Sequence, residues 1–134
     1  MQFAVNPSDE LPLYRQIMRQ ITEAIAGGRL RRGDRLASHR ELSEQLVIAP
    51  LTVKKAYDEL EALGYIETQR GRGTFVRAAL PKNARARQLG HLEEAARRLL
   101  SQAYLAGLTL PDAMGLLEDA DRELRGVGPV QEQK

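Results

Sequence analysis

Residues 36–76 read LASHRELSEQLVIAPLTVKKAYDELEALGYIETQRGRGTFV, and this stretch decides the fold. Ser38, followed three residues later by Glu41, is the pattern of a capping box, which begins a helix by satisfying orphan backbone N–H groups. Pro50 suits the first position of the next helix, which Gly64 ends. Apolar residues three or four apart predict the buried stripe of that helix: Val53, Ala56, Tyr57, Leu60 and Leu63.

After this helix, the spacing of the apolar residues changes from the period of a helix to the period of short strands. Residues 65–68 and 74–76 are rich in β-formers, and the glycines and arginines of 69–73 between them are typical of a loop. A helix beginning near Pro12 precedes the stretch, with an apolar face at Leu13, Ile17, Ile21, Ala24 and Ile25. Three helices followed by a basic β-hairpin predict a winged helix-turn-helix domain over residues 1–77.

A second, purely helical part follows a shift in composition at residues 78–83, which we interpret as a linker. Ala, Leu, Glu and Arg dominate residues 84–126, and Gly107 divides them into two helices. Thr109, with an acid three residues on, is the expected N-cap of the second helix. The predicted fold class is mainly α with a small β-hairpin: a winged helix-turn-helix domain followed by a C-terminal α-helical hairpin. We expect the tail, residues 127–134, to be disordered.

The two C-terminal helices carry apolar stripes wider than a lone hairpin would bury, because each contains an apolar doublet, at 99–100 and at 116–117. A second copy of the chain is the simplest cover for this surface, and packing back onto the N-terminal domain is the alternative. The predicted dimerisation residues are Leu89, Leu92, Ala96, Leu99, Leu100, Ala103, Leu110, Ala113, Leu116, Leu117, Ala120 and Leu124.

Composition restricts the class of protein. The chain has 134 residues, 43% of them hydrophobic, and no cysteine, which fits small soluble domains in a reducing compartment such as the cytoplasm. No apolar run reaches the roughly 20 residues of a membrane span. The formal net charge of +2 lies entirely in residues 1–77, because the remaining residues hold as many acids as bases. Between Arg29 and Arg40 a single acid, Asp34, accompanies five arginines: Arg29, Arg31, Arg32, Arg35 and Arg40.

The third helix of such a domain lies in the major groove of DNA, with its N-terminal turn at the base edges. Its predicted buried stripe assigns the opposite face to Leu51, Thr52, Lys54, Lys55 and Asp58. The lysines can contact phosphates, Thr52 can donate to a phosphate or a base edge, and Leu51 can contact a thymine methyl. The alternative for Lys55 is an ordinary surface pair with Glu59.

Two further basic features indicate an anionic partner. Arg40 lies in a first helical turn, where the macrodipole does not favour a cation, so a phosphate would account for it; a salt bridge to Glu44 is the alternative. The hairpin tip combines arginines with glycines that permit close approach, and such an arginine can enter the minor groove. The predicted DNA-binding residues are Arg35, Ser38, Arg40, Pro50, Leu51, Thr52, Lys54, Lys55, Arg70, Gly71, Arg72 and Gly73.

The sequence contains no suitable set of residues for catalysis, for metal binding or for cofactor binding. The two histidines lie far apart without ligand spacing, and no serine has a credible histidine and acid partner. The glycines at 71 and 73 lack the third glycine and the following helix of a dinucleotide fingerprint. We therefore expect no enzyme, no metal and no cofactor. If a small-molecule effector binds, the groove between the C-terminal helices is the only candidate binding site with enough room.

The chain resembles the DNA-binding domain of the GntR family of bacterial transcription regulators over residues 11–77. The motifs that carry the resemblance are Pro12-Leu13-Tyr14-x-Gln16-Ile17, Gly28-x-Leu30-x-x-Gly33-Asp34-Arg35-Leu36-x-Ser38-x-Arg40-Glu41-Leu42, Thr52-Val53-x-x-Ala56-Tyr57-x-x-Leu60-Glu61-x-x-Gly64-x-Ile66 and Gly71-x-Gly73-Thr74-Phe75-Val76. The resemblance implies a homodimeric winged-helix repressor, less often an activator, that binds a palindromic operator. Family DNA contacts match Arg40, the positions around Thr52 and Lys54, and Gly71. The short C-terminal part resembles the YtrA subfamily, whose C-terminal helices serve dimerisation.

The start of the third helix departs from the family. Many members carry arginine where this chain has Pro50, and those with proline often follow it with asparagine where this chain has Leu51. We therefore expect affinity to depend on phosphate contacts and on the wing. The predicted function is a sequence-specific transcription regulator, acting as a repressor and homodimer on double-stranded operator DNA. The alternative is a winged-helix protein-interaction module that offers its hairpin edge to a partner strand, which the arginines disfavour.

Overall fold

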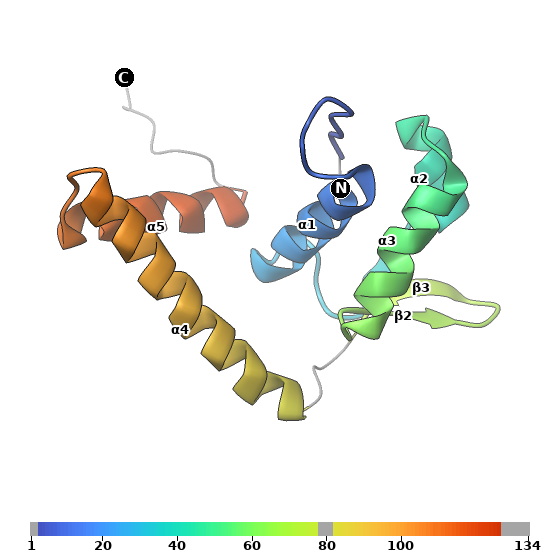
Figure 1. Cartoon of the computed structure of the whole chain (residues 1–134). Helices are drawn as coiled ribbons and strands as arrows, with labels where there is room; N and C mark the ends of the chain where they lie inside the picture. Colours follow the sequence, from blue (N-terminus) through green and yellow to red (C-terminus); the bar gives the residue numbers. More distant parts are fainter. Residues whose placement is uncertain (1–2, 78–81, 127–134) are drawn as a thin grey trace, which may run out of the picture. The chain divides into compact units, whose positions relative to one another are not determined.

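The computed structural model describes residues 3–77 and 82–126. The chain divides into two compact units, Met1–Ala79 and Leu80–Lys134. The first contains α1 (Leu13–Ala26), β1 (Arg35–Leu36), α2 (His39–Leu46), α3 (Pro50–Ala62), β2 (Ile66–Gln69) and β3 (Gly73–Val76), and the second contains α4 (Lys82–Leu105) and α5 (Leu110–Leu124) (Figure 1). The predicted fold class, mainly α with a winged helix-turn-helix and two C-terminal helices, is confirmed.

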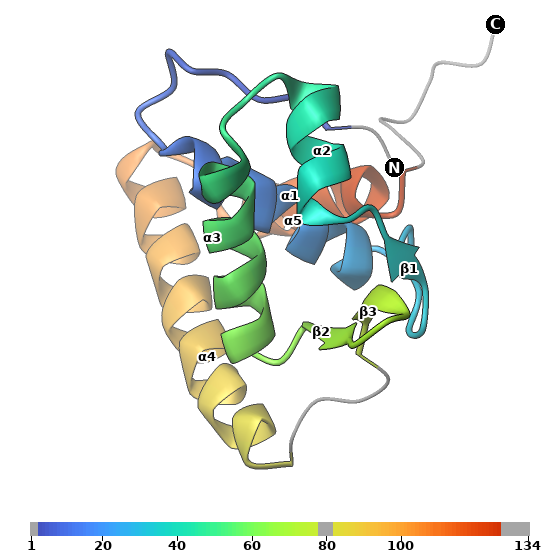
Figure 2. The same ribbon diagram turned by 90° about the vertical axis from the view of Figure 1, so that its right-hand side faces the viewer.

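The core of the first unit lies where α1, α2 and α3 meet the sheet (Figure 2). Ile17 and Ile21 of α1 are fully buried there, as are Val53 and Leu60 of α3. Burying one such side chain contributes about 1.5–3 kcal/mol. Because the apolar stripe of α3 packs against both other helices, the opposite face of α3 is left exposed.

The sheet has three antiparallel strands in the order β1-β3-β2. Strands β2 and β3 form the predicted hairpin, residues 66–76, which we call the wing. The sequence did not predict β1, which pairs Arg35 with Phe75 and Leu36 with Thr74. A strand of two residues has no period that a sequence could reveal. The pairing places the Arg35 side chain beside the wing.

The start of α2 is fixed by the predicted capping box. Ser38 Oγ accepts a hydrogen bond from the Glu41 backbone N–H at 3.1 Å, and a Glu41 carboxylate oxygen accepts one from the Ser38 N–H at 2.9 Å. Hydrogen bonds donated to the carboxylate favour its ionised form, so the Ser38 backbone N–H and hydroxyl lower the pKa of Glu41. The box orients the first turn of α2, which carries Arg40.

The predicted buried stripe of α3 was wrong at its last member. The helix ends at Ala62, Leu63 is its C-cap, and 56% of the Leu63 side chain is exposed. Gly64 follows with a φ of +90°, which turns the chain toward β2. The stripe therefore stops at Leu60, one turn before the sequence period indicates.

The second unit is a helical hairpin. Thr109 caps α5 as predicted, and Asp112 completes a capping box with it. Ala103 of α4 and Ala113 of α5 are buried within the unit, so these two predicted dimerisation residues are already covered by their own chain. Other predicted residues stay between 48% and 63% exposed: Leu89, Leu92, Leu110, Leu116 and Leu117.

Some predicted boundaries change in this part of the chain. Helix α4 begins at Lys82, so the last two residues of the predicted linker 78–83 are helical. The remaining linker residues and the tail 127–134 lie outside the described residues. In the ranges 3–77 and 82–126, no helix is long and apolar enough to span a bilayer.

Candidate nucleic-acid interface

The exposed face of α3 carries side chains that the sequence assigns to DNA. At its N-terminal turn Leu51 is 77% exposed and Thr52 is half-buried. Pro50 occupies the first turn, and the N-cap residue Ala49 makes no side-chain hydrogen bond. The positive end of the helix macrodipole is therefore not neutralised by a capping side chain, which suits an anionic neighbour.

The two lysines of α3 have different neighbours. Lys54 Nζ lies 2.9 Å from a carboxylate oxygen of Asp58, one turn further along the helix. Lys55 Nζ lies 4.3 Å from the centroid of the Tyr14 ring, a cation–π contact that joins α3 to α1. The alternative pairing of Lys55 with Glu59 is thus wrong within the described residues, and the neighbouring lysine forms the one-turn ion pair.

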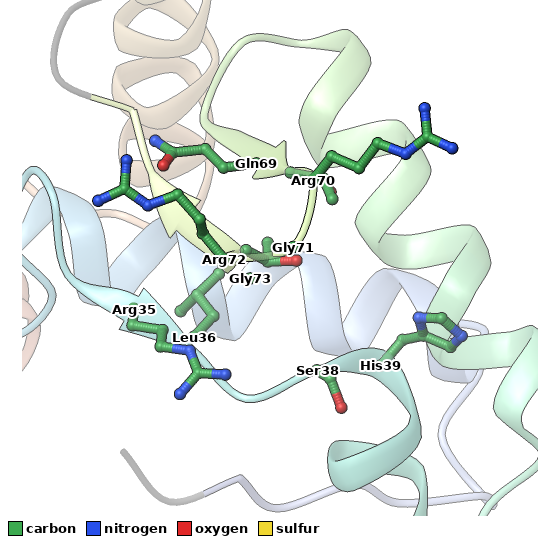
Figure 3. A pocket seen from close by; sticks show the side chains of 11 residues that line it. Arg35, Leu36, Ser38, His39, Gln69, Arg70, Gly71, Arg72 and Gly73 are labelled. Atoms are coloured by element: carbon green, nitrogen blue, oxygen red, sulfur yellow. The ribbon is translucent and has the colours of Figure 1, made fainter.

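A second basic surface lies between the wing and the start of α2 (Figure 3). This hollow, which we call the wing cleft, is open and has a volume of about 470 Å³. Its lining contains no Asp or Glu and consists of Arg35, Leu36, Ser38, His39, Thr68, Gln69, Arg70, Gly71, Arg72, Gly73 and Thr74. The cleft brings together the predicted residues Arg35, Ser38 and 70–73, whereas the α3 residues lie outside it.

The arginines of the wing cleft, and Arg40 beside it, form no close ion pair among the described residues, although, together with the stronger capping-box hydrogen bonds, the charge of Arg35 contributes to lowering the pKa of Glu41. Arg35, Arg40, Arg70 and Arg72 are all exposed, and none of them forms an ion pair in the described part of the chain. The salt bridge from Arg40 to Glu44, the alternative to a phosphate contact, is therefore not formed there. Guanidinium groups without an anion are suited to bind phosphate oxygens, with two parallel hydrogen bonds where geometry permits.

The wing loop depends on glycine for its shape. Gly71 has a φ of +77°, in the left-handed region that L residues rarely adopt, and a Cβ built on it would meet no atom within 4 Å. Position 71 therefore requires glycine because of its backbone conformation, and not because a neighbouring atom would clash with a side chain. The open space around its Cα leaves room for a nucleic-acid backbone.

One residue that lines the cleft, His39, is not among the predicted DNA contacts. His39 is the first residue of α2, is half-buried and lines the wing cleft. From the sequence, His39 is conceivable only as a metal ligand, and no group of three metal-binding side chains occurs among residues 3–77 and 82–126. Its position between Ser38 and Arg40, two predicted DNA contacts, is the signal that would have identified it.

The second unit offers a surface of another kind. An apolar groove of about 360 Å³ runs between its two helices. Its lining consists of Leu92, Ala95, Ala96, Leu99, Leu100, Leu110, Ala113, Met114 and Leu117. The lining holds no charged residue, so the groove suits an apolar partner and not a nucleic acid.

Residues 13–76 match the family described as bacterial regulatory proteins, gntR family. The HTH-type transcriptional repressor YtrA of Bacillus subtilis (strain 168) is 33% identical over 122 residues, which cover 91% of this chain and 94% of that protein. The structure of a transcriptional antiterminator from Listeria monocytogenes EGD-e superposes with a TM-score of 0.82 at 28% identity, covering 99% of this chain and 98% of that one.

A smaller match includes nucleic acid. The DNA-binding domain of AraR, solved in complex with operator ORX1, superposes with a TM-score of 0.50 at 28% identity. That match covers 57% of this chain and 98% of the AraR chain. Family, relatives and fold agree on the class of protein. The chain therefore belongs to the gntR family of bacterial regulatory proteins, as a transcription regulator with a winged helix-turn-helix DNA-binding domain and not as an enzyme.

Proposed function

We propose that the chain represses transcription in the cytoplasm by binding operator DNA through α3 and the wing cleft. The observation that carries the proposal is the set of arginines without ion pairs in the described residues, three of which line one cleft beside α3. Residues 1–77 form the DNA-binding domain in this proposal. The exposed turn of α3 enters the major groove, and the wing arginines contact phosphates and the adjacent minor groove.

The roles of individual residues follow from their exposure. Arg40 and the cleft arginines contact phosphates, so they contribute affinity for any sequence. Leu51 and Thr52, at the N-terminal turn of α3, contact base edges and therefore contribute to sequence preference. Lys54 meets phosphate in competition with Asp58, its intramolecular partner. Lys55 is drawn toward Tyr14 and contributes less.

Residues 84–126 form the dimerisation region in this proposal, with a second copy of the chain covering the apolar groove. Five leucines near half exposure or above would otherwise contact water, and their burial is the driving force for association. A two-fold dimer places two copies of α3 about 34–36 Å apart, or a multiple of that repeat. The two-fold symmetry of that dimer is why we propose a palindromic operator, and the spacing sets the distance between its half-sites.

DNA binding is tested by selecting duplexes from a random pool with the purified chain and measuring affinity across salt concentrations. If about six phosphates are neutralised per dimer, log K falls with log salt at a slope of roughly −5. Arg40→Ala should weaken binding to selected and random duplexes alike, whereas Leu51→Ala should change the selected sequence. A slope near zero contradicts DNA binding and favours a protein-interaction module.

Dimerisation is tested by charging the groove. Leu92→Glu together with Leu117→Glu should give a monomer in sedimentation, because both leucines line the groove and both are more than half exposed. Leu105→Glu is the matched control, since Leu105 is 89% exposed on α4 and lies outside the groove lining. A dimer that persists in the double variant would contradict the assignment.

A further inference from the structure

His39 is the imidazole in the lining of the wing cleft, and imidazole is the side-chain type whose charge changes in the neutral pH range. It stands at the first position of α2, half-buried, and lines the same hollow as Arg35, Arg70 and Arg72 (Figure 3). Figure 3 shows His39 and Arg70 on opposite sides of the opening, one from the start of α2 and the other from the wing loop. Imidazole becomes charged between pH 8 and 5, unlike the arginines.

The charged groups of the cleft and of the helices beside it lie on β1, on the wing, on α2 and on α3. Strand β1 contributes Arg35, and the wing contributes Arg70 and Arg72. On α2 itself the neighbours are Arg40 and Glu41, and the Glu41 carboxylate is held by the Ser38 N–H at 2.9 Å. Helix α3 contributes no residue to the cleft lining, and its charged pair Lys54 and Asp58 is joined by an ion pair of its own.

Among the described residues no Asp or Glu lines the cleft, so the lining itself offers a protonated His39 no carboxylate. A phosphate group supplies an anion there. An opposite charge within about 4–6 Å favours the charged form of a titratable group, so a phosphate in the cleft draws a proton onto the imidazole. The imidazolium then donates an N–H to a phosphate oxygen, and that bond is stronger than one from the neutral ring.

We propose that His39 is a DNA-phosphate contact that takes up a proton when DNA enters the wing cleft. The affinity of the regulator for DNA therefore rises as pH falls through the neutral range. This inference rests on the proposed DNA interface. It adds His39 to the phosphate contacts and makes the affinity for DNA depend on pH. It assigns the cleft an anionic ligand of one kind, the phosphodiester of double-stranded DNA.

The test measures the affinity of the full chain for a selected duplex at pH 6 and pH 8, at fixed salt. The wild type should bind about tenfold more tightly at pH 6, and the salt slope should be steeper there by roughly 1 per protomer. His39→Gln should remove most of this difference, because glutamine keeps hydrogen-bonding capacity without the charge. His39→Lys should bind tightly at both pH values.

The chain offers a matched control, because it contains only two histidines. His91→Gln, on the exposed surface of α4, should keep the wild-type pH dependence. In this variant the remaining imidazole proton resonance in an NMR spectrum belongs to His39. The pH at which that resonance titrates should rise when duplex is added.

The outcomes separate the inference from the proposed function. If His39→Gln keeps the pH dependence of the wild type, or if the resonance titrates unchanged with DNA, then the inference is wrong and DNA binding stands. If the wild type binds no duplex at either pH, the inference and the proposed function are both wrong. Circular dichroism should show equal melting temperatures for His39→Gln and His39→Lys, so that lost binding cannot be attributed to unfolding.

Discussion

The side chain of Arg35 occupies the space next to Gly73 that any other residue would need for its Cβ. A Cβ built on Gly73 would come within 2.8 Å of Arg35 Nε. The two residues lie on β1 and β3, which are paired in the sheet. Gly73 also has a φ of +125°, which L residues rarely adopt. The missing side chain at Gly73 is thus what allows Arg35 to lie against the loop end of the wing.

Gly73→Ala should therefore weaken DNA binding by moving Arg35. We expect a loss of about tenfold, at the lower end of what a hydrogen bond to a charged group contributes. The strained φ also lowers the free energy of unfolding by about 1 kcal/mol. The affinity for a selected duplex should accordingly be measured at a temperature at which circular dichroism shows the variant folded.

A double-mutant cycle separates the two effects of Gly73→Ala. In an Arg35→Ala background the alanine at 73 has no guanidinium to displace, so it should add little further loss of affinity. Gly28→Ala is the control for backbone strain, because Gly28 has a φ of +81° and nothing within 4 Å of a built Cβ. Equal losses from Gly73→Ala with and without Arg35 would contradict the relationship.

Tyr57 makes stability sensitive to alkaline pH. Its hydroxyl donates a 2.7 Å hydrogen bond to the Ala37 carbonyl oxygen, and 7% of the residue is exposed. Burial raises the pKa of Tyr57 well above its usual value. A pKa raised by folding contributes stability that is complete below the unfolded value, about 10, and is lost as pH rises above it.

Tyr57→Phe should be less stable than the wild type at pH 7 by about 1 kcal/mol, because the hydrogen bond to Ala37 is lost. Between pH 9 and 11, however, the free energy of unfolding should fall less steeply in the variant than in the wild type. Urea unfolding at a series of pH values measures both. Parallel curves would show that the raised pKa is not coupled to folding.

Local signals predicted the helices well. The pair Ser38 and Glu41 and the N-cap Thr109 act within one turn, so their hydrogen bonds can be inferred from spacing alone. Leu63 was assigned wrongly for a related reason: the period of three and four continues, but Gly64 ends the helix and turns the chain away. Periodicity records the spacing of apolar residues but not the point at which the helix stops.

Nonlocal pairing explains what the sequence could not predict about the site. The arginines and glycines of the wing loop stand together in the sequence, so they could be named. The position of Arg35 depends on the pairing of β1 with β3, and this register joins residues 40 positions apart. Likewise, Lys55 contacts the ring of Tyr14 on another helix, which no spacing within α3 reveals.

Val47 carries backbone strain that a substitution can relieve. It caps α2 with a φ of 56° and a ψ of 50°, the left-handed region, although valine is β-branched. The residue is 87% exposed, so removing its side chain leaves no cavity in the core. Val47→Gly should raise the free energy of unfolding by up to about 1 kcal/mol, since the relieved strain exceeds the entropic cost of glycine.

Thermal unfolding, followed by circular dichroism, measures the effect of Val47→Gly. The control is Glu44→Gly, which introduces the same glycine entropy at an exposed position with ordinary helical backbone in α2. We expect it to lower stability by about 1 kcal/mol. A loss of stability in both variants would mean that the backbone strain at Val47 is smaller than the entropic cost of introducing glycine.

Asp58 limits the contribution of Lys54 to DNA binding. The ammonium lies 2.9 Å from the Asp58 carboxylate, and both side chains are more than half exposed. Exposed pairs of this kind contribute about 0–1 kcal/mol to stability, so Asp58→Asn should leave the fold intact. With the competing carboxylate removed, Lys54 is available to phosphate. Affinity at low salt should rise several-fold, and the slope of log K against log salt should steepen by roughly 1 per protomer.

Asp121→Asn is the matched control for Asp58→Asn, because Asp121 forms a similar exposed pair at 3.0 Å with Arg125, the C-cap residue of α5. It removes the same formal charge from the second unit, so a general effect of net charge would appear in both variants. An increase confined to Asp58→Asn supports a phosphate contact by Lys54. Equal increases, or none, would place Lys54 away from the DNA and leave the major-groove contact to Leu51 and Thr52.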